Sequence, residues 1–290
     1  MRSIHLLAAA VAAFVAMPVA AKPLATEQFK ANAAIAIDPA KAYILVRAAG
    51  MDLKLLRVAT ESERTAWQSD RAEALAKAKE KYAREYARYQ RDLEYWKDQG
   101  DHGMNVSKPE KPIEPTDANF NFKALESDNF VTVWGGRVFD KGGPKTAHLI
   151  AVPPGTYRLY GQIFEAGGIG FCLCMGSVQF DAAAGTITDM GTMRYPKAEA
   201  LKDKVDPSWN GLTPGKGGLT MMRVEPADAE TYIPPKLASL PRTAASYRAA
   251  GKIDNFFGVM IDRLTALPGV LAYRRDEVID EKTGAAVGSN

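Results

Sequence analysis

Residues 153–164 read PPGTYRLYGQIF, and this stretch decides the fold that the sequence favours. Pro-Pro-Gly is rich in turn formers, and polar and apolar side chains alternate after it. Tyr157, Leu159 and Ile163 therefore share one face of an extended chain, with polar residues on the other. This pattern predicts a β-strand that is half buried in a sheet.

Other short runs on both sides of this stretch carry the same strand signal, with glycine and proline between them. They are AYILVR (42–47), LKLLRV (53–58), FVTVW (130–134), AHLIAV (147–152), FCLCM (171–175), SVQFDA (177–182) and AAAGTITDMG (182–191). We expect 42–47 and 53–58 to form a hairpin, and Gly176 to form a bulge or bend. Many short strands predict a mainly β fold with an antiparallel β-sandwich core.

Residues 59–117 interrupt the strands. Thr60 and Glu63 are spaced as a capping box, in which the threonine hydroxyl and the glutamate each bond the other's backbone N–H. Residues 61–98 contain no Gly or Pro and are dense in Ala, Glu, Lys and Arg, so they predict one long helix. Pro109, Pro112 and Pro115 then predict an extended return towards the sheet.

Aromatic and leucine residues recur along this helix at heptad spacing, as in a coiled coil. They are Leu75, Tyr82, Tyr86, Tyr89, Leu93 and Trp96. The stripe either packs on the returning proline segment or the sheet, or it meets a partner protein or a second copy, since Tyr and Trp are enriched at interfaces. Tyr82, Tyr86, Tyr89, Leu93 and Trp96 are the candidate interaction residues.

Cys172 and Cys174 are the only cysteines, and they fall in one strand pattern. Both flanking faces are apolar, which favours buried packing, because free cysteine is among the most buried residue types. A disulfide is the second interpretation, and it needs a kink, because i and i+2 in a strand are about 6.6 Å apart. A Cu(I) site that uses Cys172, Cys174 and Met175 is the third, because thiolate and thioether ligands are soft.

Residues 1–21 resemble a secretory signal peptide. Arg2 precedes an apolar, alanine-rich stretch, and small residues follow at 19–21. The apolar stretch is short for a membrane span, and no later stretch is apolar enough for one. We therefore expect a periplasmic or secreted protein without a transmembrane segment. The net charge of the whole chain is +3, which argues against nucleic acid as a partner.

The remaining chemistry-bearing residues form no motif. His102 and His148 are the only histidines outside the predicted signal peptide, too few for a histidine-rich zinc site. Residues 210–217 fail the phosphate-loop pattern, and Ser177 lacks the flanking glycines of a nucleophile elbow. We predict no catalytic residues, no bound cofactor and a non-enzymatic protein.

The order of KAYILVR, PPGTYRLYGQIF and SVQFDAAAGTITDMG resembles a pattern in uncharacterised bacterial envelope families, both periplasmic and lipoprotein-like. The resemblance covers residues 40–58 and 130–191 and implies an immunoglobulin-like or similar β-sandwich. It implies no catalytic residues. This chain lacks a cysteine in its cleavage region that could accept a lipid, and it carries the helical insertion.

The predicted organisation has four parts: a signal peptide (1–21), a β-sandwich core (22–58 and 118–195), a helical insertion with a proline-rich return (59–117), and a mixed helix and loop region (196–290). Short helices are expected near 238–250 and 255–264. The function we predict is macromolecular contact in the cell envelope, through the helical arm (61–98) or the sandwich surface. The alternative is a thiol redox or Cu(I)-binding module at Cys172 and Cys174.

Overall fold

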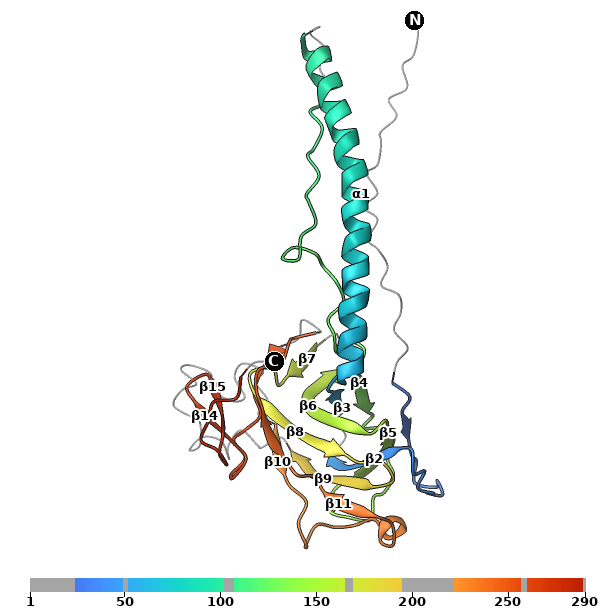
Figure 1. The fold of residues 1–290 in the computed structure, drawn as a ribbon. Helices are drawn as coiled ribbons and strands as arrows, with labels where there is room; N and C mark the ends of the chain where they lie inside the picture. The colour runs from blue at the N-terminus through green and yellow to red at the C-terminus, as the bar shows by residue number, and fades with distance from the viewer. Residues whose placement is uncertain are drawn as a thin grey trace, which may run out of the picture.

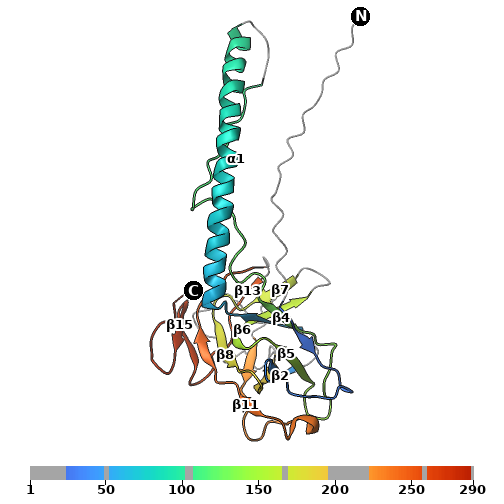
Figure 2. The same cartoon turned by 45° about the vertical axis from the view of Figure 1, so that its right-hand side comes forward.

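A computed structural model describes most of the chain and shows a β-rich body from which one long helix projects (Figure 1). The described residues are 24–48, 52–101, 107–164, 169–194, 222–256 and 260–288. The predicted signal peptide lies outside them. The projecting helix is equally clear in a view turned by 45° (Figure 2). No helix in these ranges is both long enough and apolar enough to cross a membrane.

The first sheet has six strands. Their spatial order is β1 (Glu27–Gln28), β5 (Ala147–Val152), β2 (Ala42–Ala48), β9 (Ile187–Arg194) and β10 (Arg223–Glu225), with β11 (Arg242–Ala244) also on β9. Strand β9 runs parallel to β2 and β11, and the other pairs are antiparallel. The pairing of β2 with β9 is irregular between Leu45 and Arg47.

The second sheet has seven strands. Their order is β12 (Arg248–Ala250), β8 (Ser177–Ala182), β6 (Gly155–Phe164), β3 (Leu53–Arg57) and β4 (Phe130–Val133), with β7 (Ile169–Cys172) between β6 and β13 (Met260–Ile261). Strands β14 (Leu271–Arg274) and β15 (Glu277–Asp280) form a separate hairpin. One 3-10 turn, η1, spans Pro235–Leu237.

The two sheets pack face to face over one main core. Ile44 and Val46 of β2 meet Leu55 of β3 and Leu159 of β6 there, and all are fully buried. The intervening residues of β2, such as Leu45, face the opposite side and pack under the segment that follows β1. The mainly β fold with one inserted helix is confirmed, although both sheets are mixed rather than purely antiparallel, because β13 pairs with β7 in parallel in the second sheet.

The predicted hairpin of 42–47 with 53–58 is wrong. Both segments are strands, but β2 belongs to the first sheet and β3 to the second. Each strand is buried along its whole length, so each needs neighbours on both edges and cover on both faces. Strands β5 and β9 flank β2, whereas β4 and β6 flank β3. Distant segments therefore satisfy the backbone bonds that a local hairpin would have used.

The short helices predicted near 238–250 and 255–264 are also wrong. Residues 242–244 and 248–250 form β11 and β12, and Met260–Ile261 forms β13. Helix propensity is a weak prior, and here open sheet edges outweigh it, because they offer ready hydrogen-bond partners. The described part of 196–290 thus adds strands to both sheets.

Helix α1 (Glu61–Asp101) confirms the predicted long helix and extends three residues beyond it. At 1.5 Å per residue its 41 residues measure about 62 Å. The capping box forms as expected. The Glu63 backbone N–H donates to Thr60 Oγ1 at 3.3 Å, and the Thr60 N–H donates to Glu63 Oε2 at 2.8 Å.

Candidate functional site

We use "arm" for α1 together with the returning segment 107–123. The base of the arm is held on the second sheet by buried charged side chains. The Ala59 backbone N–H donates to Glu126 Oε1 at 3.0 Å, and Arg158 lies 3.7 Å from the other oxygen of that carboxylate. Arg57, itself buried, forms an ion pair with Glu63. Partial burial acts to raise the pKa of Glu63, but hydrogen bonds from Arg57 and Thr60 lower it overall.

The returning segment runs antiparallel to α1 and packs on its aromatic stripe. Lys108 lies over the ring of Trp96 at 5.6 Å, and Lys111 lies over the ring of Tyr86 at 6.0 Å. Further down, Asp117 accepts a hydrogen bond from Arg71 at 2.9 Å. Helix numbers fall as return numbers rise, which fixes the antiparallel direction.

The foot of this return is held by Trp67. Its indole N–H donates to the Lys123 carbonyl at 2.7 Å, and its ring centre lies 5.8 Å from that of Phe122. Trp67 lies outside the heptad stripe of α1 and was not predicted from the sequence to be a site residue. An isolated tryptophan in the first turns of a charged helix is the signal that could have identified it.

The three prolines of the return face the helix. In the stretch 107–116, only Pro109, Pro112 and Pro115 are half buried, and the residues between them are exposed. A period of three is that of a polyproline II helix, which agrees with the predicted extended return. The stripe on α1 is therefore covered along one side by its own chain.

The five candidate interaction residues lie together on this stripe. Tyr82, Tyr86, Tyr89, Leu93 and Trp96 are all half buried. The ring centres of Tyr82 and Tyr86 are 5.6 Å apart, and those of Tyr86 and Tyr89 are 5.9 Å apart. Packing on the returning segment, one of the two interpretations of the stripe, is thus observed. Each side chain keeps part of its surface open to a partner.

Two large apolar side chains of the arm are open to solvent. Tyr95, one residue before Trp96, is 59% exposed, and Ile113 on the return is 84% exposed. Neither was among the candidate residues, because Tyr95 is out of phase with the heptad stripe and Ile113 stands alone between prolines.

Cys172 and Cys174 form a disulfide, and both are buried beside Leu56, Tyr160 and Ile253. Strand β7 ends at Cys172 and the chain then turns, so the two α-carbons are 5.1 Å apart rather than the spacing of a regular strand. Gly176 follows the turn with φ +144°, and a side chain there would meet Tyr273 at 2.7 Å. Only glycine therefore suits this bend.

The disulfide distinguishes between the three interpretations of the cysteines. Both cysteines are buried, as the packing interpretation expects, but they are paired, so packing as free thiols is wrong and the disulfide interpretation is confirmed. A Cu(I) site would require the disulfide to be reduced, because each sulfur is already bonded to the other. Met175, the third candidate ligand, is half buried in the turn. Across the described ranges, no group of three or more His, Cys, Asp or Glu side chains is placed to hold a metal ion.

Asp262 is a buried carboxylate next to this turn. It is 3% exposed, its backbone bonds Cys172 and Met175, and its Oδ1 accepts the Arg263 N–H at 2.8 Å. Oδ2 has no hydrogen-bond partner among the described residues. Burial raises the pKa of Asp262 to about 6, against the opposing effects of the Arg263 N–H and the Arg263 charge.

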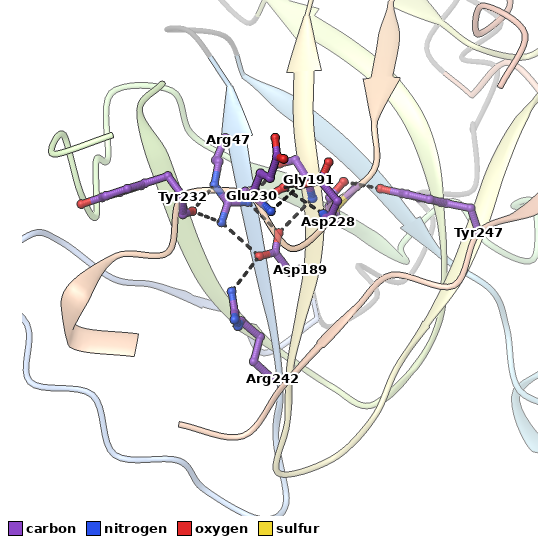
Figure 3. A network of polar contacts seen from close by, with 10 residues as sticks. Arg47, Asp189, Gly191, Asp228, Glu230, Tyr232, Arg242 and Tyr247 are labelled. Carbon is purple, nitrogen blue, oxygen red and sulfur yellow. Dashed lines mark hydrogen bonds and ion pairs between the residues drawn. The ribbon is translucent and has the colours of Figure 1, made fainter. Parts of the chain in front are cut away.

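A second buried charge cluster lies on the outer side of the first sheet (Figure 3). Arg47 and Asp189 form a two-pronged ion pair, with distances of 2.6 and 3.0 Å, and each side chain is 2% exposed. Arg47 also donates to the Tyr232 carbonyl at 2.8 and 2.5 Å, and Arg242 approaches Asp189 at 3.4 Å. The cluster thereby fastens the segment 226–242 to β2 and β9.

We call the bonded group of Arg47, Asp189 and the Tyr232 carbonyl the clamp. Gly191 is required for it. Its φ is +78°, its N–H donates to Asp189 Oδ1 at 2.9 Å, and an added side chain would meet the Glu225 carbonyl oxygen at 2.0 Å. Neither Arg47 nor Asp189 was predicted from the sequence to be a site residue. A charged residue inside an otherwise apolar strand, as in AYILVRA, is the signal that could have marked them.

The geometry of these sites favours structural roles for the buried charges. Arg47 directs all three guanidinium nitrogens at protein acceptors, and Tyr247 donates to the Met190 carbonyl nearby at 2.6 Å.

Comparisons of the chain with protein-family models, curated proteins and solved structures found no match.

Proposed function

We propose that this is a non-enzymatic protein of the cell envelope that docks another protein through its arm. The main support for this proposal is the shape and burial of the arm. Helix α1 projects far beyond the body (Figure 1), and among its described side chains only Leu75, at 7% exposed, is buried. A helix that adds so little to the core is poorly explained by folding alone, because most helical stability comes from tertiary packing. Contact with a partner would supply the missing packing.

The charge of the arm favours a protein partner. Residues 61–98 hold nine acidic and nine basic residues, so they have no net attraction to nucleic acid or to an anionic membrane. Exposed Tyr95 and Ile113, beside the half-open tyrosine stripe, provide the aromatic and apolar surface that protein interfaces favour. Export to the periplasm is part of this proposal and is supported by the signal-peptide pattern of residues 1–21.

Site-specific photocrosslinking tests the proposal. A photoreactive side chain at Tyr95 or Ile113 in the full chain should give intermolecular adducts in cells. The same group at exposed Glu80 is the matched control. Adducts with one other protein support the proposal, and dimer adducts that also form with the purified chain show that the partner is a second copy. If neither position gives intermolecular adducts above the Glu80 control, the arm is not a docking site.

A thiol redox role is the second candidate, and the disulfide between residues only two apart favours it. So short a loop gains little from the loss of chain entropy, since the stabilisation grows with loop length. The measurement is equilibration of the folded chain with glutathione buffers. A reduction potential below about −300 mV, typical of structural disulfides, would contradict a redox function. Cu(I) uptake by the reduced chain, compared with Cys174→Ser, tests the metal alternative.

A further inference from the structure

We propose that a basic hollow on the body binds a phosphate group carrying more than one negative charge. The hollow has a volume of about 520 Å³ and is formed by three segments that are distant in sequence. These are residues 30–32 after β1, residues 136–141 after β4, and residues 234–236 around η1. In Figures 1 and 2 the orange chain around β11 lies at the end of the body away from the arm.

The lining is strongly positive. Four cationic side chains surround the hollow, namely Lys30, Arg137, Lys141 and Lys236, against one carboxylate, Asp140. Four positive charges less one negative charge leave a net charge of +3. Lys30, Arg137 and Lys141 make no ion pair with any carboxylate in the described part of the chain. Such a concentration of one sign attracts counter-ions of the other sign.

The single carboxylate is already engaged. Asp140 Oδ2 accepts the Gly142 N–H at 2.8 Å, and the Tyr232 hydroxyl also bonds this carboxylate. It is therefore partly occupied by local donors and is less able to neutralise the surrounding cations. An incoming anion would relieve the repulsion between those cations.

The walls of the hollow are held in place by buried side chains. Gln28 donates to the Arg137 carbonyl at 2.8 Å, and the ring of His148, fully buried, lies 3.0 Å from the same oxygen. On the opposite wall, Lys236 Nζ donates to the Ala31 carbonyl at 2.6 Å. Buried Phe139 and Pro234 form part of the lining. The backbone that carries the cations is thus pre-organised, which lowers the cost of binding.

A multiply charged phosphate fits this site better than a single carboxylate. It matches the excess positive charge, and arginine bonds phosphate oxygens in a two-pronged geometry. The volume lies within the range of small-ligand sites, so a pyrophosphate or a phosphorylated small molecule has room. A lipid with a phosphomonoester headgroup, such as phosphatidic acid, offers the same chemistry.

Calorimetry with pyrophosphate and with inorganic phosphate on the full chain is the first test. We expect saturable binding that Arg137→Gln and Lys141→Gln each weaken about tenfold, because each removes a charge-assisted bond. Lys282→Gln loses the same charge at a position just after β15, outside the hollow, and should stay within about twofold of the unmodified chain. All three sites are exposed, so circular dichroism should show an unchanged fold.

Flotation with phosphatidic acid vesicles, and with phosphatidylcholine vesicles as the control without net charge, separates the two sources of phosphate. Flotation with phosphatidic acid that is lost in Arg137→Gln assigns a lipid headgroup, and pyrophosphate binding without flotation assigns a soluble ligand. The proposal is overturned if neither probe binds, or if Lys141→Gln and Lys282→Gln weaken binding equally. The proposed docking arm is unaffected by either result.

Discussion

Replacing Asp262 by Asn tests the buried carboxylate beside the disulfide turn. Its pKa rises from 3.8 to about 6 on burial, which is a shift of roughly two units. One unit corresponds to about 1.4 kcal/mol, so keeping this group ionised in the folded chain costs about 3 kcal/mol. The conversion is justified because the side chain is 3% exposed, and solvent screens it little.

The sign of the pH effect follows from proton binding. Between the unfolded pKa and the folded pKa, the folded chain holds more protons at Asp262 than the unfolded chain, so stability falls as pH rises. The carboxyl contributes no penalty below about pH 4, and the full penalty is present above about pH 7. The Asn side chain does not ionise, and its Oδ1 can still accept the Arg263 N–H.

Urea unfolding at several pH values measures the effect. The difference in unfolding free energy, Asp262→Asn minus wild type, should become more positive by about 3 kcal/mol from about pH 4 to about pH 7. An unpaired amide N–H in the variant would shift this difference equally at all pH values. Asp254→Asn, at an exposed position nearby, is the matched control and should not change the pH profile. Parallel profiles for Asp262→Asn and wild type would refute the reasoning.

Three further predictions concern the clamp, the helix cap and the disulfide. Arg47→Met leaves Asp189 buried without its main partner and should lower the unfolding free energy by about 3–5 kcal/mol in urea; a loss below about 1 kcal/mol would contradict the clamp. Thr60→Ala removes the capping hydroxyl, so amide exchange in the first turn of α1 should quicken about fivefold, equal to about 1 kcal/mol; an unchanged rate would contradict the cap. Cys174→Ser should lower the free energy of unfolding by only about 2 kcal/mol, because the loop that the disulfide closes is so short. If iodoacetamide labels the denatured wild-type chain without a reductant, the disulfide is absent.

The local elements were largely predictable from the sequence. Helix α1 starts at the predicted capping box, because Thr60 and Glu63 are close in sequence and their bonds need no distant partner. The runs at 42–47 and 147–152 became β2 and β5, since their apolar β-branched residues favour buried strands. The proline return also kept its predicted extended form.

The candidate sites were only partly predictable. The aromatic stripe is visible in the heptad spacing, but its cover by Pro109, Pro112 and Pro115 depends on how the return crosses the helix. The exposed Tyr95 was missed, because periodicity marks the residues that share a face and passes over those beside it.

By itself the sequence determined the long helix α1 and strands such as β2 and β5, because side-chain periodicity, helix propensity and capping act over a few residues. It did not determine β11, β12 and β13, where helices were predicted. Only the tertiary structure decided which strands become neighbours. It placed β2 and β3 in different sheets, paired Arg47 with Asp189, and brought three distant segments around the basic hollow. The physical reason is that hydrogen bonds between strands and buried ion pairs depend on proximity in space, and local patterns along the chain do not reveal which distant segments meet.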